Sequence, residues 1–367
     1  MTSGASAYCD EKWASWTTTL GFPVGGIYPP CSDGGDINAV DRSGSKKLLA
    51  TADDFGKVKL FKFPQPNKKA AFQRFIGHSS HVTNVKFSAG DSHVISTGGN
   101  DKAIFVWKLI FDKNSQETLY DDSGFDMSEF DYQKTEKNAD QGVPKPAEPM
   151  GMFSMAEEET GDQFMAIKPW LGQVEHSVPE QYKLGDPLDK VPPETNLEPW
   201  YIHGYRCFDA RQTAKWIDAD NICFVSAALG VTMNLAENTQ RFFREHDEDL
   251  VSFDMTGDRK IAASGSMPAK GRSRFVDIYV WDVETKETLA HLAGFHRGSI
   301  KLLKFSPDGS KLASFGQDDD NSLAVYDWEN SRLICTAKVD KSAVLGCGWE
   351  NESNFCTVGQ KHIKMWS

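Results

Sequence analysis

The chain has 367 residues, of which 40% are hydrophobic and 25% charged, a composition typical of a globular protein rather than a disordered or fibrous one. A net charge of −12 argues against nucleic-acid binding, because neutralising phosphates needs a basic surface. The longest apolar run, 222–233, is far shorter than the roughly 20 residues that span a bilayer, and no secretory leader pattern opens the chain, so the sequence predicts a cytoplasmic protein without membrane contact.

The first elements are short runs rich in Val, Ile, Leu and Phe that recur between 36 and 109, separated by Asp, Asn and Gly turns. One unit, 47–61, ends in Phe. The next is clearer: a Gly-His pair, a Ser/Thr, a turn Asp and a strand-ending Trp follow one another at the spacing of a WD40 propeller blade. Its members are predicted to form one hydrogen-bonded chain from loop to strand to strand: His78, Thr97, Asp101 and Trp107.

An acidic segment follows. Residues 112–200 contain 20 Asp and Glu against seven Lys, a net charge of −13, and nine of the 16 prolines, without helical or strand periodicity. Such a long connection is unusual inside a compact domain, so the sequence predicts a linker and a domain boundary here. Four tryptophans outside the obvious blades are candidates for contacts with a neighbour: Trp13, Trp16, Trp170 and Trp200.

Strand-like units resume from 204 to 366, and two of them end in Trp281-Asp282 and Tyr326-Asp327. Two blades before the acidic segment and four after it give an all-β protein of WD40 β-propeller blades. Two arrangements fit this count: one propeller stitched from both halves, or parts of two consecutive propellers. An insertion within the fourth unit places three cations within five residues: Lys270, Arg272 and Arg274.

The strings LGFPV (20–24), ADDFGKVKLF (52–61) and HSSHVTNV (78–85) resemble the closing blades of the echinoderm microtubule-associated protein-like (EMAP-like) family. After the acidic segment, Pro192-Pro193 through Gly204-Tyr205-Arg206 resembles a degenerate form of the hydrophobic HELP motif that opens this family's tandem propeller. The resemblance implies three parts. Closing blades occupy 1–111, an acidic Pro-containing linker 112–191, and a HELP-like motif with the opening blades of a further unit 192–367.

The resemblance also implies a function. EMAP-like proteins are non-enzymatic and associate with microtubules, so the implied partners are tubulin and other microtubule-associated proteins, in the cytoplasm or in the axoneme of a cilium. The insertion with Lys270, Arg272 and Arg274 is the candidate for facing the acidic tubulin surface, against the alternative of a solvated loop. A second hypothesis is a WD40 adaptor that gathers proteins other than tubulin.

The sequence gives little support to catalysis, metal binding or disulfide formation. The phosphate-cradling, zinc-protease and hydrolase motifs are missing from the sequence, so it predicts neither an enzyme nor a cofactor. His78, His81 and Asp101 fit the polar chain of a blade better than a zinc site, which needs four ligands. The acidic run 318–320 lacks the glycine and terminal Glu of a 12-residue calcium loop. The seven cysteines include no C-x-x-C pair and are expected to be free thiols.

Overall fold

Six antiparallel sheets make up almost all of the fold in the computed structural model, which describes residues 17–18, 21–28, 37–66, 70–111, 191–268, 275–318 and 321–367. The only helical element among these residues is the short 3-10 helix η2 (Phe22–Ile27). The sheets follow one another as propeller blades, which confirms the predicted all-β class. Within the described residues, no helix is long and apolar enough to cross a membrane.

The first three blades each have four strands, paired in sequence order. They are β1 (Ile37–Arg42), β2 (Leu48–Asp53), β3 (Val58–Lys62) and β4 (Phe72–Phe75); β5 (Val82–Phe87), β6 (His93–Gly98), β7 (Ile104–Phe111) and β8 (Thr195–His203); and β9 (Ala214–Trp216), β10 (Asn221–Ser226), β11 (Leu229–Asn234) and β12 (Thr239–Phe243).

The fourth and fifth blades also have four strands, and three strands are described in the sixth. They are β13 (Leu250–Met255), β14 (Ile261–Ser266), β15 (Ile278–Asp282) and β16 (Thr288–Leu292); β17 (Ile300–Phe305), β18 (Lys311–Gly316), β19 (Ser322–Asp327) and β20 (Arg332–Lys338); and β21 (Val344–Trp349), β22 (Phe355–Gly359) and β23 (Ile363–Trp366).

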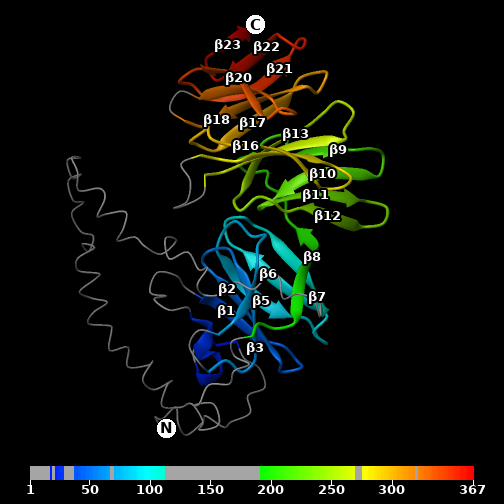
Figure 1. The fold of residues 1–367 in the computed structure, drawn as a ribbon, viewed down its shortest axis with the longest axis vertical. Helices are drawn as coiled ribbons and strands as arrows, with labels where there is room; N and C mark the ends of the chain where they lie inside the picture. The colour runs from blue at the N-terminus through cyan, green and yellow to red at the C-terminus, as the bar shows by residue number, and fades with distance from the viewer. Residues whose placement is uncertain are drawn as a thin grey trace, which may run out of the picture.

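Strands far apart in the sequence meet in the second blade. β8 pairs with β7 along its whole length, from Phe111 opposite Thr195 to Ile104 opposite His203, and Figure 1 shows the two strands side by side. The acidic segment is therefore inserted between the third and fourth strands of one blade. The division into 1–111, 112–191 and 192–367 stays a prediction. In the structure, β8 from the third part completes the blade whose first three strands come from the first part.

The core continues through this junction. Leu197 and Ile202 from β8 belong to the same buried cluster as Phe105 and Trp107 from β7 and Leu229 from β11. Central strands of the interior blades, such as β14 (IAASGS), are buried on both faces, because each interior blade is covered by a blade on either side. Small residues in these strands leave room for large rings from the neighbouring blades, and two of the largest fully buried side chains are Trp107 and Trp281.

The blades follow one another along the long axis of the molecule, with the first and the sixth at opposite ends (Figure 1). The described residues thus form an arc of blades rather than a closed ring. Antiparallel order gives the arc two faces. The bottom face is the face that carries two turns of each blade: the turn between the first and second strands and the turn between the third and fourth strands. The top face carries the loops between the second and third strands and the connections to the next blade.

Neighbouring blades are also joined by carboxylates on their first strands. Asp254 on β13 accepts a hydrogen bond from the backbone N–H of Phe305 on β17 at 2.8 Å. Asp41 on β1 does the same with the N–H of Phe87 on β5, also at 2.8 Å. Each Asp also pairs with the lysine that precedes this Phe, so a charged contact repeats at the same place in two blade junctions.

Candidate functional site

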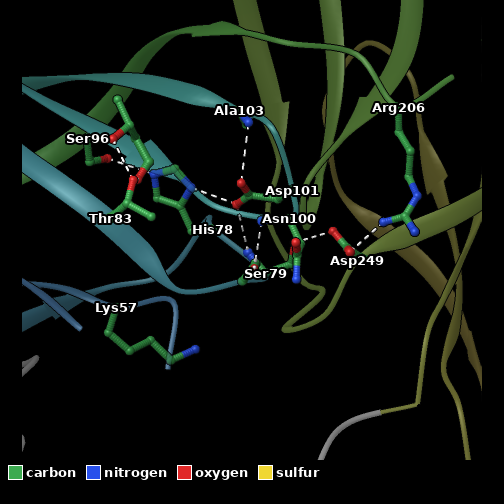
Figure 2. Close-up of polar contacts among 12 residues, drawn as sticks. Lys57, His78, Ser79, Thr83, Ser96, Asn100, Asp101, Ala103, Arg206 and Asp249 are labelled. Atoms are coloured by element: carbon green, nitrogen blue, oxygen red, sulfur yellow. Dashed lines mark hydrogen bonds and ion pairs between the residues drawn. The ribbon is translucent and has the colours of Figure 1, made fainter. Parts of the chain in front are cut away.

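A buried polar chain in the second blade leads from the core to the top face. The indole N–H of Trp107 donates to Ser96 Oγ at 2.8 Å, and Ser96 Oγ lies 2.8 Å from Nε2 of His78. The other ring nitrogen of His78, Nδ1, lies 2.7 Å from Asp101 Oδ2. Figure 2 shows His78 between Ser96 and Asp101. Three of the four predicted members, His78, Asp101 and Trp107, therefore lie in one chain.

The fourth predicted member, Thr97, has to be replaced by Ser96. Successive side chains of a strand point to opposite faces, and on β6 it is Ser96, with no exposed surface, that faces the core with Trp107. Thr97 points the other way and shares a hydrogen bond with Thr83 Oγ1 at 3.0 Å. Asp101 fixes the position of the loop, but the pleating of β6 decides whether the hydroxyl of Ser96 or that of Thr97 joins the polar chain.

Two further blades contain the histidine–serine contact of this polar chain, which the sequence analysis missed. His246 Nε2 lies 2.8 Å from Ser264 Oγ, which also accepts from the indole of Trp281 at 3.1 Å. His296 Nε2 lies 2.6 Å from Ser314 Oγ. In all three blades the serine follows the histidine by 18 residues. The spacing of 18 residues between His and Ser could have identified these two blades. The Gly-His pair could not, because only His78 follows a Gly directly.

Both additional histidines are neutral in the fold. Burial lowers the pKa of His246 to about 3, with the charge of His291 adding to the effect. Burial also lowers the pKa of His296 to about 4, although Asp318 opposes it. Among the described residues, Nδ1 of His246 has no hydrogen-bond partner, which is consistent with an imidazole held without charge.

These two histidines should make the fold sensitive to mild acid. An unfolded histidine takes up a proton as the pH falls below about 6.5, whereas His246 and His296 stay neutral in the fold, so protons favour unfolding. Between pH 7 and pH 5 we expect each to lower the free energy of unfolding by up to about 2 kcal/mol. Urea titrations at several pH values measure this loss, which should shrink in His246→Gln. An identical pH dependence in that variant would contradict the assignment.

The chain of polar contacts continues across the top face into the fourth blade. The backbone N–H of Ser79 contacts Asp101 Oδ2 at 3.4 Å, and the Ser79 hydroxyl donates to Asp249. Asp249 pairs in turn with Arg206, as Figure 2 shows. A continuous polar path thus links the buried indole of Trp107 to a guanidinium in the connection that follows β8.

Arg206 anchors this connection, which runs over the top face from Gly204 to Thr213 and which we call the crossing segment. Its guanidinium is buried and forms a two-bond ion pair with Asp209, with Nε–Oδ1 and Nη2–Oδ2 distances of 2.8 and 2.6 Å. Burial acts to lower the pKa of Arg206, but the contacts with Asp209 and Asp249 outweigh it and raise the pKa. The hydrogen bond from Arg206 holds the pKa of Asp209 below its usual value.

The crossing segment leaves an aromatic and cationic patch exposed. Phe208 is 55% exposed, and Lys102 Nζ lies 3.8 Å from the centre of its ring. The Arg206 guanidinium lies 5.1 Å from the same ring, so Phe208 is held by two cations. Tyr205 is 44% exposed nearby in the sequence, and Arg211 is exposed as well. This combination of an ordered ring and cations suits binding to an acidic macromolecular surface.

The basic insertion leaves the fold beside this patch. Lys270, Arg272 and Arg274 lie outside the described residues, but Met267 before them contacts Arg206, with an Nη2–Sδ distance of 3.6 Å. Trp13, Trp16 and Trp170 also lie outside the described residues. Trp200 is 54% exposed on β8, with its ring centre 5.0 Å from that of His93.

The described residues offer binding surfaces but no cluster of metal ligands. No group of three His, Cys, Asp or Glu side chains among them is placed to hold a metal ion. His81 lies 3.6 Å from Asp54 on the top face. Asp318 is engaged by Ser322, whose backbone N–H donates to Oδ1 at 2.7 Å. These side chains serve loop geometry, and the candidate site is the top-face patch around Phe208.

Comparisons with known proteins point to one family. A family model for the second β-propeller of echinoderm microtubule-associated protein matches residues 1–109. Echinoderm microtubule-associated protein-like 1 of Homo sapiens is 56% identical over 101 residues, which are 28% of this chain and 12% of that protein. Echinoderm microtubule-associated protein-like 4 of Homo sapiens is 42% identical over 153 residues, 41% of this chain and 15% of that protein.

The matches differ in how much of each chain they cover. Among solved structures, the computationally designed Ika4 protein aligns with a TM-score of 0.35 and 16% identity over 44% of this chain and 94% of that one, too low a similarity to support an argument. The sequence matches to the two human relatives cover 12% and 15% of those proteins. The similarity thus lies in the N-terminal part of the chain, which resembles the second β-propeller of the echinoderm microtubule-associated protein-like family, and the chain spans only a small part of the length of these relatives.

Proposed function

We propose that this chain is a non-enzymatic microtubule-associated protein that contacts tubulin through the top face of its blades. The observation that carries the proposal is the similarity of its first 109 residues to a propeller of microtubule-associated proteins. The HELP-like stretch contributes β8 and the start of the crossing segment. Its degenerate sequence is compatible with these structural roles. The setting we propose is the cytoskeleton, with axonemal microtubules of a cilium as one place where long connections can thread between protofilaments.

The top-face patch supplies the chemistry for this contact. Lys102 lies over the ring of Phe208, and Arg211 is exposed three residues further along the crossing segment. The insertion with Lys270, Arg272 and Arg274 follows Met267, which contacts Arg206. Tubulin presents an acidic surface, so cations around an exposed ring favour association through charge-assisted hydrogen bonds and apolar contact. Contacts of this kind weaken as salt screens the charges.

Cosedimentation with stabilised microtubules tests the proposal. We expect the chain to pellet with microtubules, and the double variant Arg272→Glu/Arg274→Glu to bind at least about 10-fold more weakly, because reversing two cations at an acidic surface replaces attraction by repulsion. Raising the salt from 50 to 300 mM should weaken the unmodified chain more than the variant.

The matched control reverses two cations on the bottom face. Lys46 and Lys47 are exposed in the turn between β1 and β2, so Lys46→Glu/Lys47→Glu changes the net charge equally while leaving the top face unchanged. This control should pellet like the unmodified chain. An equal loss in both variants would contradict a top-face contact. A chain that stays in the supernatant at every salt concentration would contradict tubulin binding itself and leave the adaptor hypothesis.

A further inference from the structure

The sixth blade has one face that the rest of the arc leaves uncovered. This blade lies at the end of the arc (Figure 1), and within the described part of the chain its neighbouring blade is the fifth. The face toward the fifth blade is buried in a cluster that contains Phe355 from β22 and Phe315 from β18. The opposite face of β21, β22 and β23, which we call the end face, points away from the arc.

Large apolar side chains stand on the end face. On β23, Ile363 and Met365 point away from the fifth blade, because successive side chains alternate and Trp366 packs toward that blade. Ile363 is 78% exposed and Met365 is 69% exposed, the two highest fractions for a large hydrophobic side chain among the described residues. Val358 pairs with Ile363 across β22 and β23 and is also exposed. A contiguous exposed apolar patch of this kind marks a surface for interaction.

The same strand positions are buried in the two preceding blades. Ile363 and Met365 precede Trp366 by three residues and by one. Residues at these two positions precede Trp281 on β15 and Tyr326 on β19, in the fourth and fifth blades, each of which is followed by a further blade. There the side chains are at most 4% exposed: Ile278, Val280, Leu323 and Val325. The end face therefore has the composition of a blade surface that another sheet covers.

The strands of the end face bring no charge to it. Lys364 is the one charged residue on β21, β22 and β23, and it lies between the two outward residues of β23, so it belongs to the other face. Its Nζ lies 3.1 Å from Asp340 Oδ2. An uncharged apolar face can pack against a copy of itself without bringing like charges together.

The other end of the arc offers no equivalent surface. The outer face of the first blade is covered by η2, and the two share a buried cluster that includes Val24, Ile27, Leu49 and Phe61. In the described part of that blade, no large hydrophobic side chain of β1, β2, β3 or β4 is exposed. Stacking of the sixth blade of one copy on the first blade of another therefore lacks an apolar surface. An end face is left to meet another end face.

We propose that the end face binds the end face of a second copy of this chain. A patch that contacts the same patch forms an isologous interface, which closes as a two-fold dimer. Packing of sheet on sheet already joins the fifth and sixth blades, and the dimer would continue it beyond the sixth blade. Ile363 and Met365 would then be covered as their counterparts in the fourth and fifth blades are.

Glycines on β21 suit this arrangement. Gly346 pairs with Val358 and Gly348 with Cys356, so both lie on the end face and leave it without side chains along β21. When the two-fold axis runs along the strands, β23 of one copy lies over β21 of the other. The side chains of Ile363 and Met365 then lie over glycines. This orientation also turns the top faces of both copies to the same side of the dimer.

The size of the end face indicates a weak dimer. Strands lie about 4.8 Å apart and rise about 3.4 Å per residue, so three strands of about five residues cover roughly 14 by 17 Å. Stable complexes bury about 800 Å² of each partner, and smaller interfaces belong to weak or transient association. We therefore expect a Kd on the order of 10 µM. The proposal does not depend on microtubule binding.

Sedimentation velocity of the full chain tests the proposal. Between about 1 and about 200 µM we expect the mass to rise from that of one chain toward that of two. In the variant Ile363→Glu/Met365→Glu the Kd should increase at least about 10-fold, because two carboxylates of each copy would face those of the other. A mass of one chain at every concentration would overturn the proposal.

The matched control introduces the same charges elsewhere in the arc. Leu333 and Ile334 on β20 are exposed apolar residues of the fifth blade, so Leu333→Glu/Ile334→Glu changes the net charge equally without touching the end face. This control should associate like the unmodified chain. An equal weakening in both variants would contradict a contact through the end face, as would a dimer that Ile363→Glu/Met365→Glu leaves intact. Circular dichroism of each variant checks that its fold is retained.

A charge-swap experiment tests whether the two end faces meet each other. The variant Ile363→Lys/Met365→Lys should also be a monomer by itself, because it brings like charges together. Mixed with Ile363→Glu/Met365→Glu at equal concentration, it should form a dimer, since carboxylates of one copy then face ammonium groups of the other. A mixture that stays monomeric although the unmodified chain dimerises would show that the end face contacts a different surface, and this would overturn the two-fold arrangement.

Discussion

Replacing Trp107 by alanine should lower the free energy of unfolding by about 3–5 kcal/mol. The Trp107 side chain is fully buried, and its ring stacks on that of Phe105 at 5.2 Å between centres. Truncation removes this packing between the blades, leaves a cavity and takes one hydrogen-bond donor from Ser96. Because a domain is stabilised by only about 5–15 kcal/mol in total, the loss is a large fraction. Urea denaturation followed by circular dichroism measures it as a lower midpoint.

Trp200→Ala is the matched control. Trp200 is carried by β8, the strand that pairs with β7, but its side chain is 54% exposed and its ring contacts are with His93 and Tyr201. We expect this variant to lose less than about 1 kcal/mol, since exposed substitutions away from packed cores have small effects. Equal losses for the two tryptophans would contradict the assignment of Trp107 to the core of the arc.

Asp254→Ala should cost about 3–5 kcal/mol of unfolding free energy through a different mechanism. Asp254 is 2% exposed and accepts from the backbone N–H of Phe305, while Lys215 and Lys304 both place their ammonium groups on its Oδ1. Alanine leaves one buried N–H without an acceptor and two half-buried cations without a counter-charge. Thermal and urea unfolding measure the loss.

Two variants separate the charge from the hydrogen bond. Asp254→Asn keeps an oxygen for the N–H of Phe305 and should recover part of the loss. Asp41→Ala removes the equivalent carboxylate from the first junction, where Lys86 is 46% exposed, and should cost less because exposed ion pairs contribute little. A loss below about 1 kcal/mol for Asp254→Ala would show that the buried pair does not hold the fourth and fifth blades together.

Local patterns in the sequence were sufficient to predict the blades. Short alternating runs, turn residues and the spacing from Gly-His to Trp107 are properties of one blade, and each blade is a local unit of the chain. The choice between Ser96 and Thr97 was not predictable in this way. Both are small hydroxyl residues on β6, and only the pairing register with β7 shows which of them lies on the side of Trp107.

Non-local contacts limited the prediction of the site. The crossing segment reads as a degenerate motif, whereas the structure shows that Arg206 reaches Asp249, which lies in another blade. The pairing of β8 with β7 spans the whole acidic segment, and nothing in the intervening residues indicates it. His246 and His296 were missed because their blades carry a Glu and a Phe before the histidine in place of the expected Gly.

The long sequence separation between β7 and its partner β8 has a consequence for synthesis on the ribosome. More than 80 residues are made between the end of β7 and the start of its partner, which takes several seconds at about 5–20 residues per second. During that interval the outer edge of β7, with the sequence IFVWKLIF, has no neighbour and is a template for pairing with other nascent chains. The strong negative charge of the residues that emerge next would keep such chains apart by mutual repulsion, as gatekeeper residues do beside other adhesive strands.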